Sequence, residues 1–392
     1  MRRSIPPFDD FLDLSELLEE HQRSIRDAAR QWVEKRVRPT IAHHFEEGSF
    51  PVELIREMGS MGFFGPSLPE EYGGAGLDAI SYGLILQELE RGDSGMRSFS
   101  SVQSSLVMYP IFSYGSEQQR QRWLPRLARG QAVGCFGLTE PDHGSDPGGM
   151  QTSALPLPGG GWRLNGRKMW ITNGSIADVA VVWAKSPDGI RAFLVEKGTP
   201  GFLAQTMAHK LSLRASITSE LLLDDCELGE EARLPEAMGL GAALSCLNKA
   251  RYGIAWGALG AATDCLACAV EHQKNRWQFG RPLASFQLQQ ARMAEMVSRL
   301  SQAQLLMWRL GQLEAQGRLH HTQVSLAKRN NVQAALEIAR ESRQMLGASG
   351  ITSELSVMRH MLNLESVSTY EGTHDIHTLV LGEALTGMSA FR

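Results

Sequence analysis

The sequence of 392 residues has few cysteines and no sign of a disulfide-stabilised fold. Five cysteines, an odd number in a chain of this length, argue against a disulfide framework. Cys265 and Cys268 form a lone C-x-x-C within an apolar helical run, and no second pair of ligands accompanies them. We therefore expect buried helical thiols at these two positions, and no zinc or redox site.

Signals for several other protein classes are also missing. Lys and Arg total 39 against 43 Asp and Glu, a net charge of −4 with no basic run, so nucleic-acid binding is not expected. No stretch reaches about 18 consecutive uncharged apolar residues, so no membrane insertion is expected. Arg2 and Arg3 are followed by Pro6 and Asp9 instead of an apolar core, which argues against a secretory signal. No G-x-G-x-x-G motif follows a strand-like segment, which argues against a Rossmann site.

The first third of the chain has the features of helices. Apolar residues recur with a helical period from Ile25, and Pro39 should end this helix. Asp78 is a candidate N-cap for a later helix, and a candidate capping box begins at Ser116. We therefore predict a helical domain over residues 1–131.

The composition changes near residue 132. Short apolar runs broken by Gly, Pro, Asn and Asp follow, and the runs at 179–184 and 192–195 are typical of strands. The sequence Ser-Pro-Asp-Gly at 186–189 predicts a turn between these two strands. We therefore predict an antiparallel β-domain over residues 132–236.

Helical features return in the last third. The segments 240–272, 287–316, 321–346 and 373–388 are long and amphipathic, and they predict a helical bundle over residues 237–392. Because helices precede and follow a separate β-domain, the predicted fold class is α+β.

Three segments offer both a chemical and an ordinary structural explanation. In 135–146, backbone amides beside Gly and hydroxyl side chains can cradle a phosphate or a carbonyl, but a capped β-turn has the same composition. In 168–174, the indole ring of Trp170, with Thr172 nearby, can pack against a flat ligand ring, but Trp170 can equally belong to the core. In 90–98, charges follow an apolar helix face, for which a solvated helix end is the ordinary explanation.

The segment 370–377 is the fourth candidate. Glu371 stands before Gly372 at the start of a predicted helix, on a bend where its side chain can project. His374 and His377 have helical spacing, but a metal ion needs more ligands than two. We expect an exposed histidine pair here and no metal site.

Together these strings resemble the acyl-CoA dehydrogenase family, and within it the glutaryl-CoA branch, over nearly the whole chain. The strings typical of the superfamily are L-T-E-P with G-S-D at 138–146, W-I-T-N at 170–173 and Y-E-G-T at 370–373. Those that point to the glutaryl branch are the E-L-E-R and D-S-G strings with Arg97-Ser98 over 88–98, and Y-E-G-T-H-D-I-H at 370–377. The resemblance implies a helical N-terminal domain, a middle β-domain and a C-terminal four-helix bundle, in a homotetramer built as a dimer of dimers.

The resemblance also implies FAD, bound between the β-domain and the bundle and held partly across a subunit contact. One glycine that the family has after Gln344 is Ala348 here, so an added methyl group stands near the expected nucleotide. The positions that match cofactor-binding residues of the family are Phe136, Leu138, Thr139, Ser145, Trp170, Ile171, Thr172, Arg276, Phe279, Gln287, Gln344, Thr373 and Asp375.

By the same resemblance, Glu371 is the candidate catalytic base, which removes the α-proton of an acyl-CoA thioester. Desolvation should raise the pKa of its carboxylate, and hydrogen bonds from its backbone N–H and from a ribityl hydroxyl should stabilise enolate-like charge. The β-hydride would pass to the flavin, and the electrons then to an electron-transferring flavoprotein.

The implied substrate is glutaryl-CoA, and the implied products are crotonyl-CoA and CO2, a reaction of lysine and tryptophan degradation. Arg97 with Ser98 matches the pair that binds the distal carboxylate, for which a forked guanidinium is well suited. Glu90 matches the glutamate of the decarboxylating branch, and Tyr370 lies near the same end. The other positions that match substrate-binding residues are Ser145, Asn248, Arg251 and Gly372.

Three alternatives remain at this point. The first is a dehydrogenase of another short-chain or acidic acyl-CoA without decarboxylation. The second is an acyl-CoA oxidase that passes electrons to oxygen, and the third is a non-catalytic helical assembly protein. For location, we favour a bacterial cytoplasm over a processed protein of the mitochondrial matrix.

Overall fold

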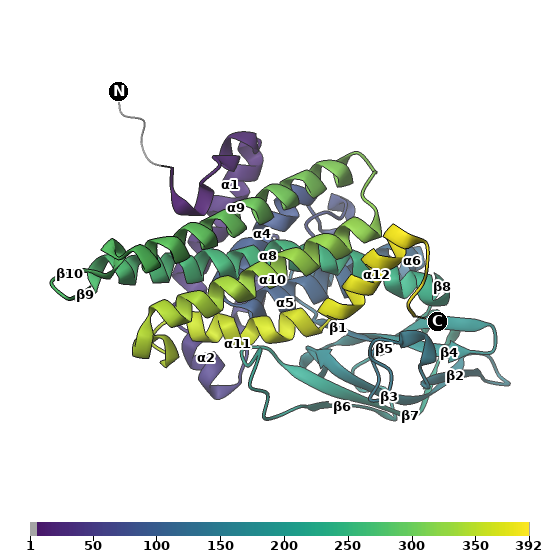
Figure 1. Cartoon of the computed structure of the whole chain (residues 1–392). Coiled ribbons are helices and arrows are strands. Elements are labelled where there is room, and N and C mark those ends of the chain that lie inside the picture. The colour runs from purple at the N-terminus through teal and green to yellow at the C-terminus, as the bar shows by residue number, and fades with distance from the viewer. Residues whose placement is uncertain (1–5, 392) are drawn as a thin grey trace.

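The computed structural model describes residues 6–391, in which helices, then strands, then helices follow one another along the chain. The long helices form one body, and the β-sheet lies against one end of it, at the lower right in Figure 1. The predicted α+β fold class is confirmed. We propose that the domains divide after residues 131 and 236, close to where helix gives way to strand and strand to helix.

The N-terminal part is helical. Its longer helices are α1 (Glu20–Trp32), α2 (Ile41–Glu47), α3 (Ile55–Ser60), α4 (Ala79–Gly92), α5 (Ser94–Ser101), α6 (Tyr109–Tyr114) and α7 (Glu117–Ala128), and π-helical segments Val33–Val37 and Val102–Met108 extend α1 and join α5 to α6. Asp78 caps α4 by accepting hydrogen bonds from the backbone N–H groups of Ile80 and Ser81 at 2.8 and 3.0 Å. The capping box of Ser116 and Gln119 begins α7, as predicted.

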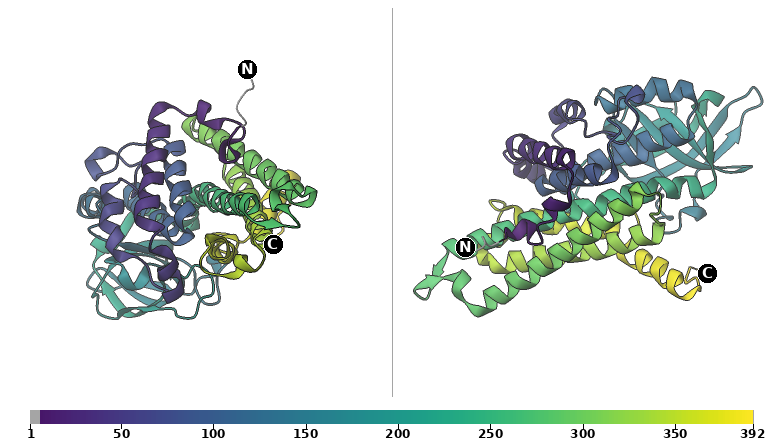
Figure 2. Two further views of the ribbon diagram at one scale, coloured as in Figure 1. Left: turned by 90° about the vertical axis from the view of Figure 1, so that its left-hand side faces the viewer. Right: turned by 90° about the horizontal axis from the view of Figure 1, so that it is seen from above.

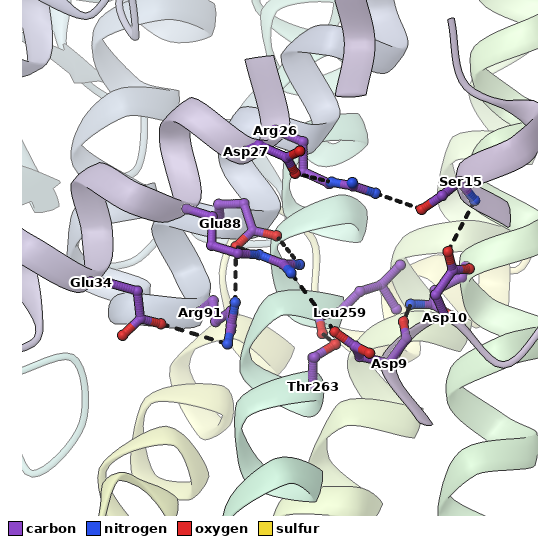
Figure 3. Close-up of polar contacts among 12 residues, drawn as sticks. Asp9, Asp10, Ser15, Arg26, Asp27, Glu34, Glu88, Arg91, Leu259 and Thr263 are labelled. Carbon is purple, nitrogen blue, oxygen red and sulfur yellow. Dashed lines mark hydrogen bonds and ion pairs between the residues drawn. The ribbon is translucent and has the colours of Figure 1, made fainter. Parts of the chain in front are cut away.

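A buried carboxylate fastens α1 to α4. Glu88 is fully buried on α4 and accepts hydrogen bonds from Nε and Nη2 of Arg30 on α1 at 3.1 and 3.0 Å. Figure 3 shows Arg91 between Glu88 and Glu34, with nitrogen–oxygen distances of 3.4 and 3.6 Å. Because a buried carboxylate must be paired, these contacts fix the register of α4 against α1. They also fix the position of Glu90, two residues further along α4.

The middle part is an eight-stranded sheet with the order β6-β7-β3-β2-β4-β5-β8 and with β1 beside β4. The strands are β1 (Gly134–Gly137), β2 (Ser153–Pro156), β3 (Trp162–Thr172), β4 (Val179–Ser186), β5 (Gly189–Glu196), β6 (Phe202–Thr206), β7 (Thr218–Leu228) and β8 (Arg233–Met238). Most neighbours are antiparallel, as predicted, but β1 and β2 pair with β4 in parallel, which the prediction lacked. Alternation along a strand fixes its buried face but not the direction of its partner.

The C-terminal part is a bundle of long helices. The helices are α8 (Gly239–Asn275), α9 (Gln287–Ala315), α10 (His321–Met345), α11 (Ser356–Thr369) and α12 (His374–Thr386), and β9 (Trp277–Gln278) with β10 (Arg281–Pro282) forms a hairpin between α8 and α9. The four predicted helical segments are confirmed to within a few residues at each end. The prediction lacked α11, whose many Ser, Thr, His and Asn residues are weak helix formers. Figures 1 and 2 show the hairpin at the end of the bundle far from the β-sheet.

The central helix of the bundle is α8. It is long and apolar enough to cross a membrane by composition, but 83% of its most apolar window is buried inside the fold, as in a core helix. As expected, Cys265 lies buried on this helix, and Cys268 is partly buried. Gly257 and Gly260 let α4 approach closely, because a Cβ atom at Gly257 would overlap Glu90 Oε2 and lie 3.0 Å from Cγ of Arg97. The bare backbone of α8 therefore makes room for two charged side chains.

We predict that Gly257→Ala destabilises the protein, because the added methyl group overlaps the Glu90 carboxylate. An overpacked core position costs about 1–3 kcal/mol of unfolding free energy. Gly241→Ala, in the first turn of the same helix with nothing within 4 Å of the new Cβ atom, is the matched control and should be neutral or slightly stabilising. Denaturation midpoints at fixed protein and cofactor concentration test this. Equal midpoints for the two variants would contradict the close packing of α4 on α8.

Candidate active site

The turn between α11 and α12 places Glu371 in an unusual backbone conformation. Its φ angle is 51°, in the left-handed region that residues other than glycine rarely adopt, and the following Gly372 has a φ of 92°. The Oε2 atom of Glu371 is buried and has no hydrogen-bond partner among residues 6–391. Local strain together with an unsatisfied buried carboxylate is typical of a functional site.

Two cations from neighbouring helices hold this turn. Arg251 on α8 donates from Nε to the carbonyl oxygen of Glu371 at 2.7 Å. Lys328 on α10 donates from Nζ to the carbonyl oxygens of Tyr370 and Gly372 at 2.5 and 2.6 Å. Three successive carbonyl groups are thus bound by charged donors, and such charge-assisted hydrogen bonds are stronger than neutral ones.

The electrostatic environment of Glu371 balances burial against positive charge. Burial raises the pKa of Glu371, while the charges of Arg97, Lys328 and Arg251 act in the opposite direction. Burial also lowers the pKa of Lys328 to about 7, against the attraction of Glu371. A carboxylate with a raised pKa is a stronger base, and the surrounding cations favour its ionised form.

A second charged group lies beside the same turn. Arg97 on α5 donates from Nε to Glu90 Oε2 at 2.6 Å and from Nη2 to the hydroxyl oxygen of Tyr370, and its guanidinium lies 5.6 Å from the centre of the Tyr370 ring. Ser94 donates to the other oxygen of Glu90 at 2.8 Å. Arg97 is only 1% exposed and Glu90 is fully buried, so a solvated helix end is the wrong explanation for this segment. The glycines of α8 leave the space that these side chains fill.

The contacts of Arg97 leave part of its guanidinium available. A guanidinium has five N–H donors. Within the described chain, hydrogen bonds to Glu90 and Tyr370 use Nε–H and one N–H of Nη2. The remaining donors, with the planar fork of the group, suit a carboxylate of a ligand. Ser98 is also buried, next to Arg97 in the sequence.

A cavity of about 560 Å³ is lined by residues of α4, α8, α9 and α10, but not by Glu371, Tyr370 or Arg97. Its lining is mainly apolar and includes Tyr82, Ser105, Asn248 and Tyr252. Asn248 connects the cavity to the turn, because its Oδ1 accepts a hydrogen bond from Nη1 of Arg251 at 3.2 Å. A cavity of this size and composition is typical of small-molecule sites.

In the β-domain, the predicted cofactor residues lie on β1 and β3 and on the segment that follows β1. Phe136 and Leu138 are buried, as is Ile171. Trp170 is 58% exposed, with a φ of 64° where the pairing of β3 with β7 is irregular, so the core explanation for this tryptophan is wrong. Thr172, two residues along the strand, is only partly buried. An exposed indole ring with a hydroxyl group nearby is suited to pack against a flat aromatic ligand such as a flavin and to form a hydrogen bond with its edge.

A buried ion pair that was not predicted supports this part of the β-domain. Lys168 on β3 donates from Nζ to Leu138 O at 3.0 Å and to Glu140 Oε1 at 2.8 Å. Glu140 also accepts hydrogen bonds from the backbone N–H groups of Gln151 and Thr152 at 2.6 and 2.9 Å. Burial lowers the pKa of Lys168 to about 8. Burial acts to raise the pKa of Glu140, but the hydrogen bonds that its carboxylate accepts outweigh this effect and lower the pKa to about 2. The pair fixes the Leu138–Glu140 segment against β3.

The other predicted cofactor residues lie elsewhere on the surface. Thr373 caps α12 by accepting from the Ile376 N–H at 3.1 Å, and Ser145 and Asp375 are exposed. Phe279 is 90% exposed in the β9–β10 hairpin, which lies at the end of the bundle far from β3, the strand that carries Trp170. A single chain therefore does not bring the two groups of predicted cofactor residues together. The group around the hairpin, all exposed, consists of Arg276, Phe279, Gln287 and Gln344.

The histidines after the turn differ from the prediction. His377 is only 1% exposed, so the expected exposed pair was wrong. Its ring packs under the turn, where a Cβ atom added to Gly372 would lie 2.8 Å from Nε2 of His377. Burial lowers the pKa of His377 to about 3, so this imidazole is neutral at physiological pH.

Comparisons with known proteins identify the family of this chain. Family models described as the N-terminal, middle and C-terminal domains of acyl-CoA dehydrogenase match residues 19–131, 135–226 and 237–386. The chain is 37% identical over 372 residues to the short-chain specific mitochondrial acyl-CoA dehydrogenase of Homo sapiens, covering 93% of this chain and 90% of that protein.

Two solved structures of glutaryl-CoA dehydrogenase from Mycobacterium smegmatis are also similar. One matches with a TM-score of 0.97 and 54% identity, and the other, in complex with FADH2, with a TM-score of 0.97 and 52% identity. Each match covers 99% of this chain and 100% of the other. The chain therefore belongs to the acyl-CoA dehydrogenase family.

Proposed function

We propose that this chain is an FAD-dependent dehydrogenase that converts glutaryl-CoA to crotonyl-CoA and CO2. The observation that carries the proposal is the buried guanidinium of Arg97, which lies beside Tyr370 and next to the strained Glu371 turn. A buried cation needs a partner, and Glu90 occupies only part of its donors. The similarity to glutaryl-CoA dehydrogenase of Mycobacterium smegmatis, at 54% identity, supports the same substrate.

Glu371 is the proposed base for the α-proton. No donor among residues 6–391 forms a hydrogen bond with its buried Oε2 atom, so this oxygen is available to take the proton of a bound thioester. Burial raises the pKa of this carboxylate and increases its strength as a base. FAD, when bound, supplies the electron sink that accepts the β-hydride. Trp170 and Thr172 would hold the flavin ring, and Lys168 keeps their neighbour Leu138 in place.

Arg97 is the proposed anchor for the distal carboxylate of glutaryl-CoA. A free guanidinium edge can bind both oxygens of that group and so fix the acyl chain with its α- and β-carbons at Glu371. Loss of CO2 after dehydrogenation leaves a dienolate that must take up a proton, and the proton held by Glu371 is available for this step. Glu90, paired with Arg97, is the proposed determinant of decarboxylation.

A dehydrogenase of a straight short-chain acyl-CoA is the second candidate. The 37% identity to the human short-chain enzyme favours it. Such a substrate has no distal carboxylate, so it would leave the free donors of the buried Arg97 without a partner. We therefore prefer the dicarboxylic substrate.

We also propose a homotetramer that passes electrons to an electron-transferring flavoprotein. The β9–β10 hairpin, with the exposed Phe279 and Arg276, lies far from β3 within one chain, so a second subunit would have to bring such residues to the flavin. Relatives of this architecture come from bacteria and from mitochondria. For this chain we keep the bacterial cytoplasm as the proposed location.

Glu371→Gln should remove the base and keep the fold. We expect kcat with glutaryl-CoA and an artificial electron acceptor to fall by about 10²–10⁴-fold, with FAD still bound. Glu365→Gln, an exposed carboxylate on α11, is the matched control and should keep wild-type kcat. A Glu371→Gln enzyme as active as the control would show that another group takes the proton.

Arg97→Leu should affect the two candidate substrates differently. We expect kcat/KM for glutaryl-CoA to fall by about 100-fold or more, since truncating one partner of a buried charge pair removes about 2–5 kcal/mol of binding. Butyryl-CoA, which has no distal carboxylate, should lose less than about 10-fold. Acceptor reduction and released CO2 are measured together on each substrate. Equal losses on both substrates, or no CO2 from the wild-type enzyme, would instead favour the short-chain dehydrogenase.

A further inference from the structure

Lys328 occupies an unusual position behind the Glu371 turn. It is 1% exposed in the middle of α10, although lysine is almost never fully buried without a partner. Its Nζ atom donates to the carbonyl oxygens of Tyr370 and Gly372, the two residues that flank Glu371. It also lies 5.8 Å from the centre of the Tyr370 ring. No salt bridge of Lys328 with a carboxylate is present within residues 6–391, so carbonyl groups are its main partners.

These contacts act on the backbone of the turn. A non-glycine residue with a φ of 51° stays in that conformation only when its surroundings hold it there. Lys328 binds the carbonyl groups on either side of Glu371, and Arg251 binds the carbonyl group of Glu371 itself. A rotation of the backbone at Glu371 would break these hydrogen bonds, so they oppose reorientation of its side chain.

The charge of Lys328 also reaches the carboxylate. The groups that face Glu371 are Arg97 from α5, Arg251 from α8, Lys328 from α10, Tyr82 from α4 and, within the same segment, Tyr370 and His377. The three cations favour the ionised form of Glu371, whereas His377 is neutral and the burial of both tyrosines raises their pKa. Removing one cation should therefore make Glu371 harder to ionise.

We propose that Lys328 is a positioning residue for the base: it holds the backbone on both sides of Glu371, and its ammonium charge keeps the Glu371 carboxylate ionised. This inference rests on the proposed role of Glu371 in proton abstraction. It accounts for a buried lysine that contacts neither the cavity nor the β-domain. It also distinguishes two cations that both favour the ionised form of Glu371: Lys328 binds the backbone beside the base, whereas Arg97 is the proposed anchor of the distal carboxylate.

The test uses the FAD-loaded enzyme with Lys328→Met, which keeps the length of the side chain and removes its charge and donors. Loss of a cation close to a carboxylate raises the carboxylate pKa, so the acid limb of the kcat–pH profile should move up by about one pH unit. We expect kcat at pH 7 to fall by about 100-fold, and by the same factor with glutaryl-CoA and with butyryl-CoA. Lys35→Met, an exposed lysine near the end of α1, is the control and should leave the profile unchanged.

Chemical rescue adds a second readout. In Lys328→Ala, ethylamine or propylamine supplied in the buffer should enter the space left by the side chain and restore part of kcat. Met and Ala variants that lose activity equally at every pH, with no rescue by amines, would reduce Lys328 to a purely structural role and overturn the proposal. Wild-type kcat and an unshifted profile in Lys328→Met would also overturn it.

Three further outcomes keep the inference testable and separate from the proposed function. If Lys328→Met does not take up FAD, Lys328→Gln replaces it in the test, because glutamine keeps a donor but has no charge. The acid limb of its kcat–pH profile should move up in the same way, and an unshifted acid limb overturns the proposal. If Glu371→Gln is inactive while Lys328→Met behaves as wild type, only the inference on Lys328 fails. If Glu371→Gln stays active, the assignment of the base fails and the inference fails with it.

Discussion

The proposed active site depends on one strained turn, in which Glu371 is held in a left-handed conformation and its Oε2 atom has no hydrogen-bond partner in the part of the chain that the structure describes. The turn has no stability of its own, because non-glycine residues avoid this region and an unsatisfied buried oxygen is unfavourable. It persists because α8 and α10 supply Arg251 and Lys328, which bind the carbonyl groups of three successive residues. The helical bundle is thus the scaffold that keeps the proposed base available.

Positive charge is concentrated around this turn, and each cation has a different task. Arg97 is paired with Glu90 and has donors left for a ligand, while Arg251 and Lys328 bind backbone carbonyl groups. Burial and charge act in opposite directions on Glu371, so the carboxylate is a strong base that can still be ionised. Bare glycines on α8 make this arrangement possible, because any larger residue at position 257 would occupy the space of Glu90.

Much of the fold follows from local features of the sequence, and most of the site does not. The N-cap at Asp78 and the turn after β4 depend on nearby residues, and both were predicted correctly. The burial of His377, the parallel pairing of β1 and the hydrogen bonds of Lys328 to the Glu371 turn depend on contacts between segments far apart in the chain. Residues at the site were found through resemblance to a family, whereas their charge balance and the separation of the hairpin from the β-domain required coordinates.

A crystal structure of the Glu371→Gln variant with FAD and glutaryl-CoA bound tests the central claim most directly. Because the variant cannot take the α-proton, the substrate should remain intact in the site. The account predicts the side chain of residue 371 about 3–3.5 Å from the α-carbon, on the face opposite the flavin, and the guanidinium of Arg97 within hydrogen-bonding distance of the distal carboxylate. A residue 371 that points away from the α-carbon, or an Arg97 that makes no contact with the ligand, would contradict it.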